Sequence, residues 1–557
     1  KMLFGSTLIP KEKPPPDPPS KEGDLVGRPV NKGLRCVEQK CHHHQRGATI
    51  MSQGVLPFQY EEEKKSTGMT AVAGLPAYLD LARVAGLAKS IGRHVRLREG
   101  GQGWSDSQMI SSLILLNLAG GECVDDLRVL EKDEGFCRVL RRTESYGMHL
   151  RKRRAAQRRW RRGRQRSVPS PTAAFRYLEG FHDEEEESKR LPHKAFIPAA
   201  NEALEGLGKV NGDLVAFVQT RSPHNQATLD MDACLVETEK QEALYSYKKY
   251  KAYQPLTTYW AEADLIVHSE FRDGNVGAGY QQLRVFKEAL DHMPPGVEKV
   301  MMRSDTAGYQ RELLKYCAEG KNERFGVIEF AVGVDVTPEF KKAVAQVAQE
   351  DWHTLEREVE GEKIPTDQQW AEVCFVPNWI GHSKKSPDYR FIAIREPLRQ
   401  VPLPGMDEQL SLPFPTMELA DKGWHKLFGV VTNRELAGDD LIWWSRQRCG
   451  KGEEAHGVLK DDLAAGKLPS GYFGVNAAWW AMAVLAFNLN SAMKRLVLGK
   501  QWVRKRLKAV RFAFISLPGR VVRRARTLII RLTRDHPSYG LLVGARQRIL
   551  ALAHSPP

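Results

Sequence analysis

Residues 227–236, ATLDMDACLV, alternate apolar residues with small or acidic ones, which is the pattern of a β-strand. Asp230 and Asp232 stand two residues apart in this stretch, so both side chains project to one face and Met231 projects to the other. Burying a carboxylate in an apolar strand is unfavourable unless the carboxylate is paired or binds a metal ion. The stretch therefore predicts a core strand whose acids have a specific partner.

The residues that follow predict an α/β core. We expect strands at 254–260, 265–269, 299–303 and 325–332, with helices at 281–290 and 310–318. Residues 336–422 are irregular and contain prolines, which is typical of an insertion. The core resumes with a strand at 427–432, a long helix at about 439–463 and an apolar helix at 476–490. Three strands followed by alternating helices and strands favour a sheet covered by helices.

Upstream of this core the apolar spacing is helical. Helices are expected at 75–91, 105–118 and 125–140, with Ser105 as an N-cap and Gly120 as a stop signal. We divide the chain into an N-terminal extension that is disordered or non-native, a helical region with an arginine-rich segment, two parts of the α/β core with the insertion between them, and a basic C-terminal helical region. Their boundaries are 1–50, 51–205, 206–335, 336–425, 426–495 and 496–557. Met51 is a candidate for the true start of the protein.

The positive charge is concentrated in two segments. The 557-residue chain has a formal net charge of +15. Residues 151–166 contain ten Lys or Arg and no acid, and residues 500–557 contain fourteen with Asp535 as the one acid, so the remainder is acidic. Such concentrated charge favours a polyanion, nucleic acid first, although an anionic membrane surface or a solvated helix face is the alternative. The longest apolar run, 477–487, is too short to cross a bilayer, so we expect a cytoplasmic protein without a membrane partner.

Two further positions can complete an acidic site. Asp305 closes the expected strand VMMRSD at the carboxyl edge, where α/β sheets place their ligands. Glu453 and Glu454 follow on the long helix. Carboxylates from three such elements can hold two magnesium ions for in-line phosphoryl transfer.

Five stretches carry a resemblance to a known family: TLDMDACLVET (228–238), YKAYQPLTTYW (250–260), HSEFRDGNVGAGYQQL (268–283), MRSDTAGYQRELLKYC (302–317) and RCGKGEEAHGVLKDDLAAGKLPSG (448–471). The sequence resembles the bacterial insertion-sequence transposases of the thirteen-eighty family, which are Asp-Asp-Glu transposases with a ribonuclease H-like core. The resemblance implies a mixed sheet flanked by helices and an insertion before the Glu-bearing helix.

The resemblance assigns roles to individual residues. It implies that Asp232, Asp305 and Glu453 are catalytic and hold two Mg²⁺ or Mn²⁺ ions, with Arg448 and Lys460 positioning phosphates. Cys234 stands where the family usually has Thr, and four residues rather than three separate Arg448 from Glu453. Glu454 is the alternative glutamate; we prefer Glu453 because it keeps the spacing to Lys460.

The implied function is cut-and-paste transposition: binding of terminal inverted repeats by a homodimer on paired ends, strand cleavage and strand transfer in the bacterial nucleoid. A ribonuclease H-like endonuclease or resolvase without strand transfer, and an inactive domesticated DNA-binding protein, are the alternatives. Twelve basic residues are expected to contact double-stranded DNA: Arg151, Lys152, Arg153, Arg154, Arg158, Arg159, Arg161, Arg162, Arg504, Lys505, Lys508 and Arg511.

Overall fold

The computed structural model describes residues 67–98, 103–151, 154, 166–191, 194–377, 389–398, 414–419, 423–525 and 527–554. By its contacts the chain divides into two units, residues 1–63 and 64–557, and all described residues belong to the second. The extension expected at 1–50 lies outside the described residues.

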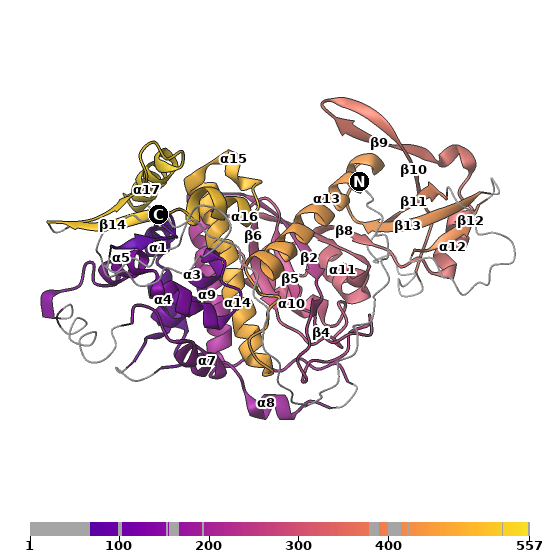
Figure 1. Ribbon diagram of the computed structural model, residues 1–557. Coiled ribbons are helices and arrows are strands. Elements are labelled where there is room, and N and C mark those ends of the chain that lie inside the picture. The colour runs from indigo at the N-terminus through magenta and orange to yellow at the C-terminus, as the bar shows by residue number, and fades with distance from the viewer. Residues whose placement is uncertain are drawn as a thin grey trace, which may run out of the picture. The chain divides into compact units, whose positions relative to one another are not determined.

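A large mixed sheet carries the candidate site (Figure 1). Its central strand, β2 (Gln226–Ala233), lies parallel to β7 (Lys299–Ser304), which lies parallel to β8 (Glu329–Gly333). On the other side β2 pairs antiparallel with β5 (Leu256–Trp260), and β5 pairs antiparallel with β6 (Leu265–Glu270). All five strands match the expected core strands. The carboxyl ends of β2, β6, β7 and β8 therefore meet at one edge.

Helices cover the sheet as expected. α10 (Gln282–Asp291) and α11 (Arg311–Ala318) follow β6 and β7, and α13 (Gly438–Gly457) continues into a π-helical turn, Val458–Asp462. The mixed α/β architecture with a helix-flanked sheet is thus confirmed.

The stretch expected to be an irregular insertion is instead ordered into strands. After α12 (Pro338–Ala345), four strands extend the sheet beyond β13 (Trp424–Thr432): β9 (His353–Val359), β10 (Glu362–Glu372), β11 (Arg390–Pro397) and β12 (Thr416–Glu418). β10 is exposed over most of its length, so its sequence lacks the apolar alternation that identifies a strand.

The N-terminal region is helical, as expected, but the single helices expected at 75–91 and 125–140 are each broken in two, at Gly86 (φ +71°) and at Asp133, which caps the helix that follows. It comprises α1 (Pro76–Val84), α2 (Leu87–His94), α3 (Asp106–Ala119), α4 (Leu127–Lys132), α5 (Glu134–Glu144), α7 (Pro171–Glu179), α8 (Glu184–Ser188) and α9 (Glu202–Arg221). Ser105 and Gln108 form a capping box at the start of α3, and Gly120, at φ +97°, ends it. The domain boundary expected between residues 205 and 206 falls inside α9.

A fully apolar helix joins these helices to the sheet. α14 (Phe473–Ala492) is buried on all sides and packs against α3, α9 and β6. The Asn488 side chain donates to Asn211 Oδ1 at 2.7 Å and accepts from the Ile266 backbone at 2.8 Å. One hydrophobic cluster consequently runs through the helical region and the catalytic core. Trp479 and Trp480 belong to it, which confirms that they are core residues.

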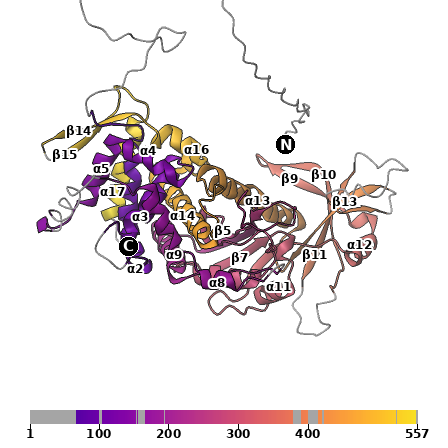
Figure 2. The same cartoon turned by 60° about the horizontal axis from the view of Figure 1, so that its bottom comes forward.

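The C-terminal region, expected to be helical over residues 496–557, contains a β-hairpin as well as helices. Two short helices, α15 (Lys500–Val503) and α16 (Leu507–Val510), precede a hairpin of β14 (Gly519–Arg524) and β15 (Thr527–Arg531), and α17 (Tyr539–His554) follows. β14 also pairs with β1 (Met69–Thr70), so the N-terminal and C-terminal regions share a three-stranded sheet. The hairpin lies beside α5 (Figure 2). Pro518 and Gly519 interrupt the helical spacing at this point.

Arg511 is not available as predicted. Its guanidinium donates to the backbone carbonyls of Leu118, at 2.9 Å, of Asn117, at 2.5 Å, and of Asp462. These bonds fix the C-terminal region to the end of α3. Arg504, Lys505 and Lys508 are exposed, in agreement with the prediction for them.

Candidate active site

The two aspartates end neighbouring parallel strands. Asp232 stands at the carboxyl end of β2, with 18% of its side chain exposed. Asp305 follows β7 directly, and its Oδ1 accepts from the backbone of Ala307 at 3.0 Å, which caps the short 3₁₀ helix Thr306–Gly308. The structure therefore shows both aspartates at the carboxyl edge of the sheet, where the site is expected.

Helix α13 brings its glutamates to the same edge. Gly452 is buried, and a Cβ atom built on it would lie 3.8 Å from Asp232 Oδ2, so the helix approaches the strand closely at this point. Burial raises the pKa of Asp232 to about 6. The positive charge of Arg448 lowers this pKa, and the negative charges of Asp305 and Glu453 raise it. Asp305 and Glu453 are thus both close enough to act on Asp232.

Glu454 faces a different part of the molecule. Its side chain lines a narrow hollow with Tyr259, Asp264 and Lys494. Its charge acts on Tyr259, whereas that of Glu453 acts on Asp232. This placement supports the choice of Glu453, which stays a prediction.

Basic side chains surround Asp232. Arg448 Nη1 lies 3.3 Å and His456 Nδ1 lies 3.9 Å from Asp232 Oδ2. Burial lowers the pKa of His456 to about 4, helped by Lys460 and Arg448, so this imidazole is neutral at pH 7. Lys460 donates to the Leu235 carbonyl at 3.3 Å. Arg448 is thus beside the first aspartate, and Lys460 lies against the chain that follows β2; the action of both on phosphates remains a prediction.

Asp230 has a structural partner instead of a metal. Arg303 donates to its two carboxylate oxygens at 2.6 and 2.8 Å, and both side chains are almost fully buried. Arg303 also donates to the Trp444 carbonyl at 2.6 Å. Its guanidinium lies 5.2 Å from the Trp444 ring, and that of Arg434 lies 4.1 Å from it. Arg303 therefore ties β2, β7 and α13 together beside the three carboxylates.

Two residues near the site were not assigned to it from the sequence. Asp335 follows β8. Burial raises its pKa, and the negative charge of Asp305 raises it further. The expected domain boundaries put Asp335 at the last position before the insertion and outside the candidate site; its position after a third parallel strand was the available signal. His456 was detectable by its place one helical turn after Glu453.

The donor set suits a hard divalent cation. Carboxylate oxygens are the ligands that Mg²⁺ and Mn²⁺ prefer, and the mutual repulsion of Asp232, Asp305 and Glu453 is what a bound cation relieves. Within the described residues no group of three or more His, Cys, Asp or Glu side chains is already spaced to hold a metal ion. The chemistry of the residues fits, and binding requires the three side chains to converge.

The raised pKa of Asp232 predicts a pH-dependent stability. Its folded-state value of about 6 exceeds the usual 3.8, so folding favours the protonated form, and this stabilisation is lost as the pH rises from about 4 through 6. In metal-free buffer, Asp232→Asn should gain about 2 to 3 kcal/mol relative to wild type between pH 4 and pH 7. Urea unfolding midpoints at several pH values measure this. A constant difference across that range would contradict the assignment.

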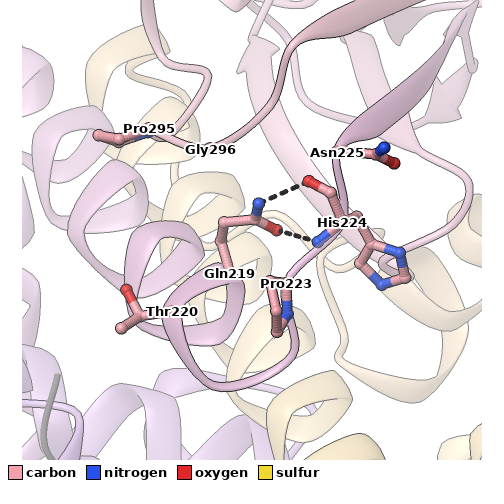
Figure 3. Close-up of a pocket in the computed structure, with 7 residues that line it drawn as sticks. All are labelled: Gln219, Thr220, Pro223, His224, Asn225, Pro295 and Gly296. Carbon is pink, nitrogen blue, oxygen red and sulfur yellow. Dashed lines mark hydrogen bonds between the residues drawn. The ribbon is translucent and has the colours of Figure 1, made fainter.

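A separate hollow lies elsewhere (Figure 3). It encloses about 460 Å³ and is lined by Gln219, His224, Asn225 and Gly296 among others. Gln219 exchanges two hydrogen bonds with the His224 backbone, at 2.6 and 3.0 Å. Asn225 directly precedes β2, so this hollow lies at the opposite end of the strand from Asp232.

Among the helices of the described ranges, none is long and apolar enough to cross a membrane.

Acids gathered at the carboxyl edge of an α/β sheet define the class of proteins that bind ligands or cations there. The match to known families is specific: the chain belongs to the transposase DDE domain group 1 family, which matches residues 64–401 and 413–554. It is thus a transposase of the DDE class.

Among solved structures, the chain is similar to the cryo-EM structure of the piggyBac transposase synaptic complex with hairpin DNA. The identity is 10%, the TM-score is 0.40, and the similarity covers 87% of this chain and 82% of that one. No curated protein matches the sequence.

Proposed function

We propose that the protein is a DNA transposase that binds the terminal inverted repeats of an insertion sequence of the thirteen-eighty family and cuts and joins the element by a cut-and-paste route. The observation that carries this proposal is that Asp232 and Asp305 end neighbouring parallel strands beside the turn of α13 that bears Glu453, in a chain of the DDE transposase family.

In this proposal Asp232, Asp305 and Glu453 hold two divalent cations, Mg²⁺ or Mn²⁺. Bound cations supply activation of the attacking oxygen and stabilisation of the leaving one. Arg448, which lies 3.3 Å from Asp232, and Lys460, which donates to the Leu235 carbonyl, neutralise the phosphates of the reacting strand. Because Arg448 pairs with Asp232 when no substrate is present, it turns from the carboxylate to the phosphate when DNA enters.

DNA affinity comes from the basic segments. Arg151 and Arg154 are exposed, and the rest of the expected contacts at 152–162 lie outside the described residues. Arg504, Lys505 and Lys508 provide a second exposed group. Two DNA-bound copies on paired element ends complete the proposed assembly.

The decisive experiment incubates the protein with labelled element ends, a target duplex and Mg²⁺. Joined products support a transposase. Cleavage without joining indicates a nuclease or resolvase, and binding without cleavage indicates an inactive DNA-binding protein.

The arginine-rich segment should bind phosphates without reading sequence. Its ten basic side chains are accompanied by Gln157 and Gln165 as the only amides, so few groups can read base edges. Changing Arg153, Arg154, Arg158 and Arg159 to Ala should reduce the magnitude of d log K/d log[salt] by up to about four. Titrations against element ends and random duplex should show similar losses. Loss confined to the element ends would mean that this segment reads sequence.

The C-terminal group is tested with point variants. Truncation at residue 500 is unsuitable because it removes β14, which pairs with β1, and the contacts of Arg511 with α3. The double variant Arg504→Ala, Lys505→Ala should lower the salt slope by up to about two while leaving the thermal unfolding midpoint nearly unchanged. Lys508 is kept because its Nζ lies 3.6 Å from the buried carboxylate of Asp462. An unchanged slope would show that this group does not contact phosphates.

A further inference from the structure

Four exposed tyrosines lie on loops of the core. Tyr245 and Tyr247 stand in the loop between β3 (Val236–Glu237) and β4 (Ala252–Tyr253), and they are 65% and 71% exposed. Tyr280, 38% exposed, precedes α10, and Tyr472, 51% exposed, precedes α14. We call these four residues the tyrosine rim.

The rim loops start from the edge that carries the candidate site. The loop with Tyr245 and Tyr247 follows β2, and the loop with Tyr280 follows β6, which runs in the same direction. The two loops touch, because a Cβ atom built on Gly274 would lie 2.7 Å from the Leu244 carbonyl oxygen. Gln310, in the turn after Asp305, donates to the Gly279 carbonyl at 2.5 Å.

Close packing places the fourth tyrosine beside the same loop. A Cβ atom built on Gly471 would lie 2.5 Å from the Glu242 carboxylate, so the segment before α14 lies against the loop after β2. The Tyr472 ring stacks on His182, with centroids 4.8 Å apart. This ring is therefore held in place although half of it is exposed.

The turn that presents Tyr245 and Tyr247 is rigid. Ser246 is buried, and its backbone and Oγ donate to the Tyr250 carbonyl at 2.8 and 2.9 Å. The Lys249 backbone, at φ +65°, donates to the Ser246 carbonyl at 2.9 Å. Two tyrosine rings are thus presented to solvent at little further entropic cost on binding.

The charge beside these rings is positive. Lys248 and Lys249 directly follow Tyr247 and are exposed, and no acid occurs in residues 243–251. Lys248 Nζ lies 5.8 Å from the centroid of the Tyr247 ring. Lys251 is engaged, since its Nζ donates to the Gln241 carbonyl at 2.7 Å. The large hydrophobic side chains left exposed in loops 234–251 and 271–281 are all tyrosines. These loops lack the exposed aliphatic residues that an apolar protein partner would contact.

We propose that the tyrosine rim stacks unpaired bases of a DNA strand whose backbone is held by Lys248 and Lys249. Rigid aromatic rings interleaved with lysines are typical of single-strand binding, because every base offers a π-face and each base is linked to a phosphate. The inference rests on the proposed function for its choice of DNA, and it adds that the site binds strand ends with unpaired bases in preference to intact duplex.

The test compares two DNAs with the full-length protein in Ca²⁺ buffer. One is a blunt duplex, and the other is the same duplex with a short single-stranded extension containing 2-aminopurine. Wild type should bind the extended DNA more tightly and quench 2-aminopurine fluorescence. The variant Tyr245→Ala/Tyr247→Ala should lose at least about fivefold of this preference and most of the quenching, since stacking contributes about 1 to 3 kcal/mol per base.

Two variants act as controls. Tyr245→Phe/Tyr247→Phe keeps the rings and should keep the preference. Tyr539→Ala removes a tyrosine that is 61% exposed on α17, outside the rim, and should behave as wild type. If wild type binds the two DNAs equally well, or binds neither, the proposal that the tyrosine rim stacks bases is wrong. The proposal is also wrong if the Phe variant loses the preference for the extended DNA.

Failure of the rim and failure of the proposed function are distinguishable. If Tyr245→Ala/Tyr247→Ala joins strands normally and its preference for the extended DNA is unchanged, base stacking by the rim is wrong and the proposed transposase activity stands. If the preference for the extended DNA depends on the tyrosines but no cleavage occurs in Mg²⁺, base stacking by the rim stands and catalysis by this chain is wrong.

Discussion

Alanine at Asp232, Asp305 or Glu453 is expected to lower the rate of strand cleavage by at least about 10³-fold, because each change removes a metal ligand and metal binding contributes several kcal/mol to transition-state stabilisation. Affinity for the element ends should stay nearly unchanged, since the basic segments supply it. Single-turnover cleavage in Mg²⁺ and binding in Ca²⁺ measure the two quantities separately.

Glu454→Ala is the matched control for the glutamate. This side chain neighbours Glu453 on α13 but lines the hollow with Tyr259 and Lys494. It should retain cleavage within a few-fold of wild type. Retained cleavage in Glu453→Ala together with loss in Glu454→Ala would reverse the assignment.

The second large effect concerns the buried pair of Asp230 and Arg303. Arg303→Met leaves the Asp230 carboxylate buried without its partner, and the Trp444 carbonyl loses a donor. We expect a loss of about 3 to 5 kcal/mol of unfolding free energy. Urea unfolding followed by tryptophan fluorescence and by circular dichroism measures the loss and shows whether both signals change together.

Two comparisons identify the cause of that loss. The double variant Asp230→Leu/Arg303→Met removes both charges and should recover much of the stability, because no buried charge is then unpaired. Arg311→Met removes an exposed arginine, 3.8 Å from Glu312, and should change stability by less than about 1 kcal/mol. A double variant as unstable as Arg303→Met would show that the contacts with Trp444 dominate.

The core strands and the two aspartates were predictable because their signals are local. β2, β5, β6, β7 and β8 have buried apolar patterns, and Asp305 ends its strand at an edge that the sheet order determines. The choice between Glu453 and Glu454 needed the spacing to Lys460, because both follow the same helical pattern.

Other features could not be predicted because their causes are distant in sequence. β10 is held by pairing with β9 and β11 and has no buried face that a pattern would show. The spacing of residues 501–517 is helical, yet nothing in it reveals that β14 pairs with β1 or that Arg511 bonds to α3. The role of Asp230 likewise depends on Arg303, which a neighbouring strand supplies.

The pairing of β1 with β14 affects how the chain folds during synthesis. Met69 lies opposite Arg520, so the strand near the start of the described chain has no partner until nearly all of the protein has left the ribosome. Until then the edge of β1 is unpaired, and the face of α1 that α17 later contacts is uncovered. Completion of this half of the molecule is therefore post-translational. Chains that end early should depend on chaperones or be degraded, and a nascent transposase should become competent to bind DNA only after release.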